Sequence, residues 1–251
     1  HRSAMAISQR LAVPEVVGRL LAARGVGAES AERFLDPKLR ELMPDPSSLM
    51  DMDRAAGRVA RAIFTGEKIA VFGDYDVDGA TASALLRSYL SELGVNIEVY
   101  IPDRIREGYG PTATAFESLR ENGAEVVVTV DCGTTAHDAL SRAEDIGLDV
   151  IILDHHMAGP ALPRCFALVN PNRLDDDSGQ GSLAAVGVTY LLIVALNRSL
   201  READFFTNKA EPNLVALLDL VALGTVCDLV PLTGLNRALV RQGLKVLATR
   251  D

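Results

Sequence analysis

The sequence of 251 residues contains no tryptophan, only 5% aromatic residues and three cysteines, Cys132, Cys165 and Cys227. No two cysteines form a C-x-x-C pair, so the pattern predicts neither a disulfide framework nor a thiolate zinc site. Sparse cysteine of this kind is typical of a reducing compartment, and we expect a cytoplasmic protein. No segment has the ~20 consecutive apolar residues of a membrane span and no signal-peptide pattern is present, so we expect no membrane contact.

Positively charged residues are also scarce: the sequence has 25 Lys and Arg against 34 Asp and Glu, which gives a formal net charge of −9. Phosphate contacts normally require Lys and Arg, so charge alone argues against a nucleic-acid enzyme. However, bound cations reverse the local field wherever acidic residues form a metal site. The chain also stops after a helix-like segment, and we expect basic domains to follow in the natural protein.

Several nucleotide and hydrolase motifs are missing as well. There is no Walker A sequence and no G-x-G-x-x-G, which leaves nucleoside-triphosphate and dinucleotide binding unsupported. No G-x-S-x-G is present, so a serine nucleophile on a strand-to-helix turn is not predicted either.

The first 65 residues are predicted to form an N-terminal helical extension. Apolar residues recur at helical spacing from residue 8 to about 65, for example at Val16, Leu20 and Phe34. Pro44 and Pro46 interrupt this pattern. Residues 1–6 are expected to be a remnant of an expression tag.

From Lys68 onward, strand patterns alternate with helix patterns. We predict strands at 69–72, 95–101, 126–130, 149–153 and 166–169, and helices at 80–93, 112–123, up to 146, 183–200, 213–223 and 235–248. Such alternation predicts an α/β fold with a parallel sheet flanked by helices on both faces. Residues 66–251 are therefore expected to form one domain.

Acidic residues follow three of the predicted strands directly. Asp74, Asp131 and Asp154 take these positions. Parallel sheets bind ligands at the carboxyl ends of their strands, so these side chains should meet at one edge. The neighbouring polar residues are Asp76, Asp78, His155 and His156. So many carboxylates together are costly unless cations neutralise them, and we therefore predict a metal site.

Each motif also has a simpler interpretation. The segment from Gly73 to Gly79 reads D-x-D-x-D-G, like a calcium loop, but later ligands of such a loop are missing; a solvated acidic turn is the other alternative. Asp131 could be a turn or cap residue, and Cys132 beside it reads better as a packed thiol than as a nucleophile. Asp228, in an apolar stretch, could cap a helix.

Adjacent histidines after a buried strand are rarer, and His155-His156 favours a functional site because neutral imidazole is a common ligand for manganese, zinc or iron. Together the motifs could hold two metal ions roughly 3.5–4 Å apart, an arrangement that stabilises the attacking and leaving oxygens of a phosphoryl displacement.

The ordered motifs Asp76-x-Asp78, Asp131, Asp154-His155-His156 and Asp228 resemble those of the DHH phosphoesterase superfamily. The chain also resembles the RecJ branch of this superfamily, the single-stranded-DNA-specific exonucleases. The segments that carry this likeness are Phe34-Leu35-Asp36-Pro37, Pro44-Asp45-Pro46, Asp51-Met52, Gly73 to Thr81, Ile101 to Arg104 with Glu107 to Gly110, and Val169 to Asn172. This resemblance implies 5′→3′ digestion of single-stranded DNA into 5′ mononucleotides, in recombination and repair, with two Mn²⁺ or Mg²⁺ ions as cofactors. It also implies single-strand-binding protein and a RecQ-type helicase as partners.

The resemblance assigns roles to individual residues. It implies that Asp76, Asp78, Asp131, His155 and Asp228 are metal ligands, with Asp131 bridging the ions. His156 would contact the scissile phosphate, and Asp154 would orient the histidines. Family II pyrophosphatases have a histidine four residues before the first motif aspartate, where this chain has Phe72; Asp74 is the candidate replacement.

Arg104 and Arg106 follow the second predicted strand and are candidates for binding substrate phosphates, with ordinary solvated loop charges as the alternative. Two rival functions remain: a DHH phosphodiesterase of nano-RNA or cyclic dinucleotides, or a pyrophosphatase; and, from another class, a non-catalytic DNA-binding scaffold like the replication factor Cdc45. The resemblance implies that residues 66–251 are the catalytic domain and that a second domain follows Asp251. We therefore expect this chain alone to bind manganese but to be inactive or feeble on DNA.

Overall fold

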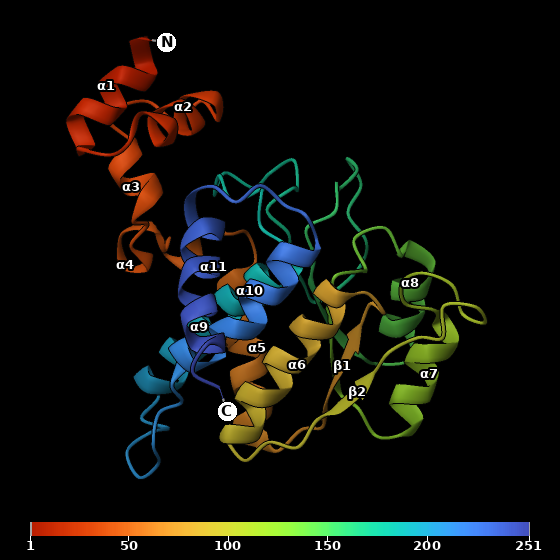
Figure 1. Ribbon diagram of the computed structural model, residues 1–251. Coiled ribbons are helices and arrows are strands. Elements are labelled where there is room, and N and C mark those ends of the chain that lie inside the picture. The colour runs from red at the N-terminus through yellow and green to blue at the C-terminus, as the bar shows by residue number, and fades with distance from the viewer. Residues whose placement is uncertain (1, 251) are drawn as a thin grey trace.

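The computed structural model describes residues 2–250, which form a sheet-containing body and a small helical lobe that projects from it (Figure 1). The helices of the lobe and of its connection to the body are α1 (Arg2–Leu11), α2 (Glu15–Ala23), α3 (Ala31–Leu35), α4 (Leu39–Leu42) and the 3₁₀ helix η1 (Pro46–Ser48). The body contains α5 (Met52–Thr65), α6 (Val77–Glu92), α7 (Ala113–Glu121), α8 (His137–Asp145), α9 (Ala185–Glu202), the 3₁₀ helix η2 (Leu214–Leu217), α10 (Leu218–Cys227) and α11 (Gly234–Leu247).

The sheet has five parallel strands in the order β2-β1-β3-β4-β5, which confirms the predicted α/β class. The strands are β1 (Ile69–Gly73), β2 (Glu98–Tyr100), β3 (Val126–Val130), β4 (Asp149–Leu153) and β5 (Ala167–Val169). The prediction of a strand over 95–101 was too long. Ala70 pairs with Glu98 and β1 begins only at Ile69, so residues before Ile97 have no partner on the neighbouring strand.

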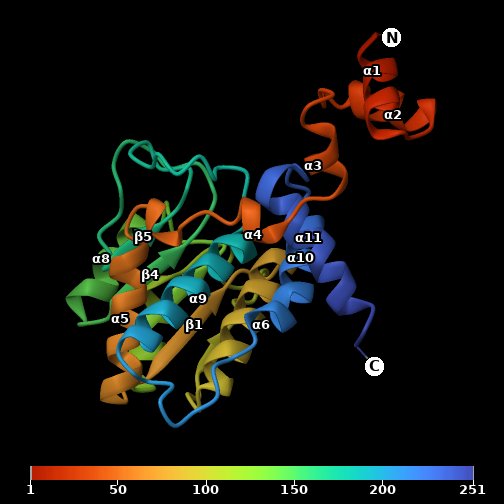
Figure 2. The same cartoon turned by 90° about the vertical axis from the view of Figure 1, so that its left-hand side faces the viewer.

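Helices cover both faces of the sheet, as a parallel sheet requires. On one face, α5, α6 and α9 pack against Val71, Val128 and Ile151 (Figure 2). On the other face, α7 and α8 pack against the alternate residues, such as Phe72 and Ile152. Helix α10 packs outside α6 and α9, and α11 packs against α10. All the strands end at the same edge, where the candidate site lies.

The N-terminal helices have a small apolar cluster of their own, formed by Ile7, Leu21, Val26 and Ala31. Residues 2–6, expected to be a tag remnant, lie in α1, where Ala4 is buried. Helix α5, expected in the N-terminal extension, packs on the sheet instead. The division of the chain at residue 65 therefore stays a prediction. Every helix within residues 2–250 is too short or too polar to cross a bilayer.

Candidate metal centre

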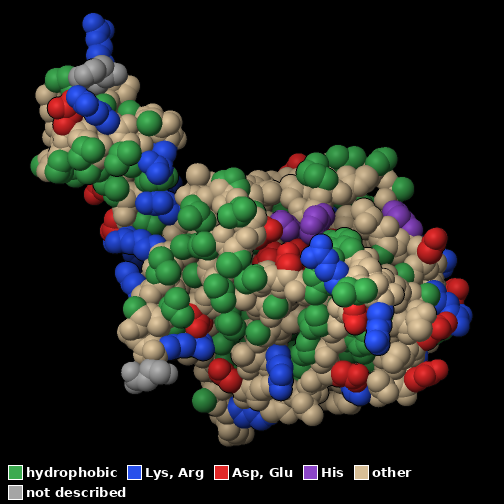
Figure 3. All heavy atoms as spheres, turned by 45° about the vertical axis from the view of Figure 1, so that its right-hand side comes forward, with side chains coloured by type: hydrophobic (Ala, Val, Ile, Leu, Met, Phe, Trp, Pro, Cys, Tyr) green, Lys and Arg blue, Asp and Glu red, His purple; other side chains and the backbone are tan. Residues whose placement is uncertain are grey.

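Three neighbouring strands deliver carboxylates to one edge of the sheet. Asp74 follows β1, Asp131 follows β3 and Asp154 follows β4, and all three side chains are buried. Acidic and histidine side chains gather at one place on the surface (Figure 3). The structure therefore brings together the residues that the sequence predicted to meet.

The loop after β1 turns directly into α6. Asp76 is the N-cap of this helix, with its Oδ1 accepting the backbone N–H of Gly79 at 2.9 Å. Because of this cap, α6 begins at Val77, three residues earlier than predicted. A Cβ atom on Gly79 would lie 2.5 Å from the carbonyl oxygen of Asp74, so only glycine permits this close turn.

Asp78 points into the body, where it joins α6 to the start of α9. Its Oδ2 accepts the backbone N–H of Ala185 at 2.6 Å and its Oδ1 accepts that of Val186 at 2.9 Å. Burial raises the pKa of Asp78 to about 6, although these two hydrogen bonds oppose the increase. In a metal-free site this carboxyl would therefore take up its proton at a higher pH than an ordinary aspartate, at about pH 6.

Asp131 lies in the middle of the site with a left-handed backbone, φ 63°. Non-glycine residues rarely adopt this conformation, which is most often seen at turns and functional sites. The side chain is 2% exposed, and its Oδ1 lies 3.3 Å from His155 Nε2 and 3.9 Å from His156 Nδ1. Burial raises the pKa of Asp131 to about 8, and the negative charges of Asp78 and Asp76 add to the increase while His155 opposes it.

Asp154 organises the loop that carries both histidines. Its Oδ1 accepts the backbone N–H groups of His155 and His156 at 2.7 and 3.2 Å and also lies 2.8 Å from His156 Nδ1. Its Oδ2 accepts the N–H of Thr134 at 3.0 Å. Burial by itself would raise the pKa of Asp154, but the hydrogen bonds from His156 and Thr134 hold it below the ordinary value. Asp154 is therefore an ionised anchor rather than an open ligand.

Asp228 completes the site from α10. It is the C-cap residue of that helix, where the helix dipole disfavours a carboxylate, so the simple capping interpretation does not explain it. Its Oδ2 lies 3.8 Å from His155 Nδ1. Gly224, one turn earlier, allows α10 to approach, since a Cβ there would lie 3.0 Å from Asp78 Oδ1.

The donor atoms of the site form three groups, two of which share Asp131. Each residue of a group offers one ligand atom, and the ligand atoms of a group all lie within 4.8 Å of one another. The first group is Asp74, Asp76 and Asp131, the second is Asp78, His155 and Asp228, and the third is Asp131, His155 and His156. Asp74 Oδ1, Asp131 Oδ1 and Asp228 Oδ2 are buried without a hydrogen-bond partner among residues 2–250. Buried carboxylate oxygens without donors are costly unless a cation binds them, so these residues fit Mn²⁺ or Mg²⁺.

Two sequence interpretations can now be set aside. Asp74 and Asp76 share one group while Asp78 belongs to another, so the D-x-D-x-D-G segment does not wrap one ion as a calcium loop does. Cys132 is fully buried, with its Sγ 3.5 Å from the carbonyl oxygen of Val130, and burial raises its pKa well above the ordinary value. It is a packed thiol, as expected.

Phe72 and the two candidate arginines take different positions. Phe72 stacks on Tyr100 in the core, with ring centroids 5.4 Å apart, so it leaves the neighbouring Asp74 as the available donor. The guanidinium of Arg104 lies 5.1 Å from the ring centroid of Tyr75, beside the acidic loop. Arg106 is 86% exposed, with its Nε 3.9 Å from Asp103, and the structure does not bring it to the metal centre.

Sequence reasoning missed three residues that hold the site. The Tyr109 hydroxyl donates to the backbone carbonyl of Asp131 at 3.2 Å and lies 3.4 Å from His156 Nδ1. Asn170 Nδ2 donates to the carbonyl of His156 at 2.8 Å, and Asn172 Nδ2 donates to that of His155 at 2.5 Å. The sequence features that could have pointed to these residues were the glycines on either side of Tyr109 and the segment Asn170-Pro171-Asn172. Both belong to the segments that resemble the RecJ branch, but the resemblance assigned no role to them.

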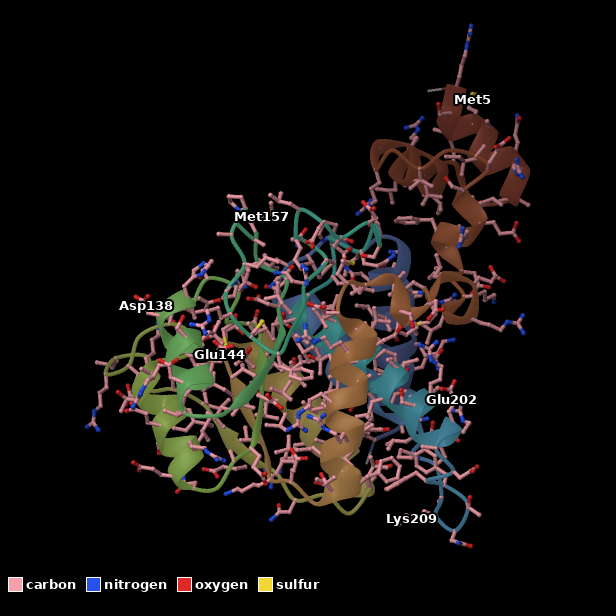
Figure 4. All side chains as sticks on the ribbon, turned by 180° about the vertical axis from the view of Figure 1, so that it is seen from behind. Met5, Asp138, Glu144, Met157, Glu202 and Lys209 are labelled. Carbon is pink, nitrogen blue, oxygen red and sulfur yellow. The ribbon has the colours of Figure 1, made fainter. Side chains whose placement is uncertain are left out.

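The loop beyond His156 rises above the sheet edge. Met157 lies on this loop and points away from the body (Figure 4), with 74% of its surface exposed. The histidine pair thus lies between the packed sheet edge and the solvent, with the His155 side chain 14% exposed and that of His156 49% exposed.

Comparisons with known proteins agree with this geometry. Residues 68–225, more than half of the chain, match the sequence model of the DHH family, N-terminal domain. The chain belongs to the DHH family. It is 40% identical over 235 residues to the single-stranded-DNA-specific exonuclease RecJ of Salmonella typhimurium, covering 92% of this chain and 40% of that protein.

Two solved structures of RecJ from Thermus thermophilus are also similar. The complex with Mn²⁺ matches with a TM-score of 0.75 and 32% identity, over 97% of this chain and 33% of that one. The complex with Mg²⁺ matches with a TM-score of 0.64 and 29% identity, over 97% of this chain and 29% of that one. The chain thus spans less than half the length of these relatives.

Proposed function

We propose that this chain is the metal-binding catalytic part of a hydrolase that digests single-stranded DNA from 5′ to 3′ and releases 5′ mononucleotides. The observation that carries the proposal is Asp131, a buried carboxylate shared by two groups of metal-ligand atoms. The relatives named single-stranded-DNA-specific exonucleases supply the substrate class and the biological setting of recombination and repair.

Two Mn²⁺ or Mg²⁺ ions would be held by two sets of residues that have Asp131 in common. Asp74, Asp76 and Asp131 would hold one ion. The other would bind Asp78, His155 and Asp228, together with Asp131, whose Oδ1 lies 3.3 Å from His155 Nε2. When bound, such ions neutralise the charge that develops on a phosphoryl group and stabilise its attacking and leaving oxygens. The Mn²⁺ and Mg²⁺ complexes of the Thermus thermophilus protein support this choice of metal.

The chain's own residues would orient and bind the phosphate. Because Asp154 binds the Nδ1 side of His156, the Nε2 side stays free for a phosphate oxygen. The hydrogen bond to Asp154 raises the pKa of His156, which favours the imidazolium form and hence a hydrogen-bond donor at Nε2. Arg104 would contact a further phosphate, and Tyr109 would hold the backbone of Asp131.

The proposal extends to the location of the protein and to its protein partners. The cysteine pattern supports a cytoplasmic enzyme. The family likeness supports single-strand-binding protein and a RecQ-type helicase as partners of the whole protein. Arg106 stays a candidate for a phosphate that lies further from the metal centre, since its side chain is open to solvent.

End-labelled single-stranded DNA tests the proposal. The chain is incubated with Mn²⁺ and DNA labelled at either end, beside Asp131→Ala and the exposed-residue control Asp177→Ala. We expect mononucleotides from the 5′ end, slowly, with at least a roughly 100-fold loss in D131A and no loss in D177A.

Other substrates separate the rival functions. If DNA stays intact while short oligoribonucleotides or pyrophosphate are hydrolysed, the exonuclease assignment is wrong and another phosphoesterase activity is correct. If the chain binds DNA but hydrolyses none of these substrates with Mn²⁺ or Mg²⁺, a binding scaffold is the better description.

A further inference from the structure

A cluster of cationic side chains lies between the N-terminal lobe and α11, outside the metal centre. Three hollows are lined by these residues, and they adjoin because each pair of them shares Pro37, Arg237 or Arg241. We call the cluster the basic band; it consists of Arg24, Arg33, Lys38, Arg40, Arg237, Arg241 and Lys245. Lys and Arg side chains also follow one another along the connection between lobe and body in Figure 3.

The spacing on α11 aligns three of these cations. Arg237, Arg241 and Lys245 recur every four residues, so they lie on one face of the helix about 6 Å apart along its axis. Across the hollow, Lys38 and Arg40 come from the segment around α4. The band is therefore a strip of positive charge rather than a single point.

Few acidic side chains compensate the band. Asp36 and Glu41 are the acidic residues that line the hollows, and Asp36 pairs with both Lys38 and Arg241. Within residues 2–250, Arg24, Arg33, Arg40, Arg237 and Lys245 form no ion pair with an acidic side chain. Elsewhere in this acidic chain, exposed arginines such as Arg142 and Arg164 do have carboxylate partners.

Arg237, at the centre of the basic band, is affected by the positive charges around it. The guanidinium of Arg237 stacks on the ring of Phe34, 3.9 Å from its centroid, and donates to the Phe34 carbonyl. Burial and the nearby charge of Arg24 lower the pKa of Arg237. An anion bound between these residues would relieve the repulsion.

The band also connects with the metal centre along the chain. Leu232, Thr233 and Gly234 line two of its hollows, and they follow Asp228 by only a few residues. The exposed Leu229 lies between them. A flexible polyanion that reaches the carboxylates could continue over this loop onto α11.

We infer that the basic band binds the phosphate backbone of a single DNA strand and extends the proposed active site into a longer binding track. The inference rests on the proposed function only for the identity of the strand. A strand fits better than an acidic peptide because its charges repeat regularly, as do those of α11.

The test compares two variants with equal changes in charge. The first is Arg40→Gln with Lys245→Gln, since both side chains are exposed and form no hydrogen bond within residues 2–250. The control is Arg142→Gln with Arg164→Gln on the far side of the body. Binding of a fluorescein-labelled oligothymidylate of about 20 nucleotides is measured by anisotropy in EDTA, from roughly 50 to 200 mM salt.

For the R40Q/K245Q variant we expect affinity for the oligothymidylate to fall on the order of tenfold at about 0.1 M salt. The slope of log affinity against log salt should shrink by about 1.4, since each phosphate contact on a single strand contributes about 0.7. The control should stay within about twofold of the wild type. If the two variants bind alike, or if a labelled polyglutamate of the same length binds the wild type as tightly as the oligothymidylate, the inference is wrong.

Hydrolysis of a dinucleotide with Mn²⁺ separates this inference from the proposed function, because so short a substrate does not reach the band. R40Q/K245Q should cleave the dinucleotide at the wild-type rate but show a raised KM on the long oligothymidylate. If the wild type cleaves neither, the proposed function is wrong, while the binding data in EDTA still decide whether the band binds a strand.

Discussion

Replacing Asp154 by asparagine tests how the histidine loop is held. The carboxylate accepts four hydrogen bonds: three at Oδ1, from His155 N and from both His156 N and Nδ1, and one at Oδ2 from Thr134 N. An amide has one acceptor and one donor end. If its oxygen keeps the three donors at the Oδ1 position, its NH₂ group must face the N–H of Thr134.

The energetic cost follows from that mismatch. Asp154 is 1% exposed, so water cannot compensate. A buried donor left unsatisfied costs about 1–3 kcal/mol, and loss of the charge-assisted bond to His156 adds a comparable amount. We expect D154N to be less stable by about 3 kcal/mol, which lowers the Tm by roughly 6–12 °C in a chain of this size.

The loss should also depend on pH. Hydrogen bonds hold the folded pKa of Asp154 below its unfolded value, so its stabilisation is present above the unfolded value and is lost as pH falls through the folded one. The gap between wild type and D154N should therefore narrow on acidification. Activity on DNA with Mn²⁺ should fall about 10–100-fold, as is usual when a partner that orients a ligand is removed.

Thermal melts of the metal-free proteins from about pH 3 to 8, with a hydrolysis assay at neutral pH, check these expectations. Asp177→Asn is the matched control, because Asp177 is exposed and should change neither value. If D154N melts within about 2 °C of the wild type and keeps at least half its activity, Asp154 does not orient the histidines.

Three further predictions concern the carboxylates and the glycine that packs against them. Asp131→Asn should abolish tight Mn²⁺ binding in calorimetry, and a variant that still binds Mn²⁺ like the wild type would contradict the shared-ligand assignment. The metal-free stability of this variant at about pH 8 should equal or exceed that of the wild type, because the buried carboxylate has a pKa raised to about 8. In EDTA, the Tm of the wild type should fall as pH rises from about 5 to 8. The reason is that the raised pKa values of Asp78 and Asp131 make the folded chain bind more protons than the unfolded chain in this pH range. Saturating Mn²⁺ should remove the dependence of the Tm on pH, and a Tm in EDTA that does not change with pH would refute this prediction. Gly224→Val should lower the stability of the fold by about 1–3 kcal/mol and weaken Mn²⁺ binding, since even a Cβ atom at this position would lie 2.3 Å from Thr81 Oγ1. The control Gly57→Ala should be neutral or stabilising in the same melts, because a Cβ atom there meets no other atom within 4 Å.

Much of the fold could be predicted because it depends on local patterns. The run of Val126 to Val130 is apolar at all but one position, as expected for a strand buried on both faces, and β3 has the predicted bounds. Thr112, the first residue of the helix predicted over 112–123, caps α7, with its Oγ1 accepting the N–H of Ala115 at 3.1 Å. The prediction was less accurate where a side chain has two roles, as at Asp76, which starts α6 early by capping it.

The order of strands and helices, and therefore the meeting of Asp74, Asp131 and Asp154 at one edge, was determined by the sequence alone. Periodicity and the rule that ligands bind at the carboxyl ends of parallel strands suffice for that. Only the tertiary structure decided how the metal-ligand atoms are divided among the groups of the site and which residues hold them in place. The backbone N–H groups that hold Asp78 belong to Ala185 and Val186, which are 107 and 108 residues away. The hydroxyl that holds the backbone of Asp131 comes from Tyr109, on the loop after β2. Such partners are set by the packing of α9, α10 and the loops around the sheet, and interactions between distant segments leave no periodic pattern in the sequence.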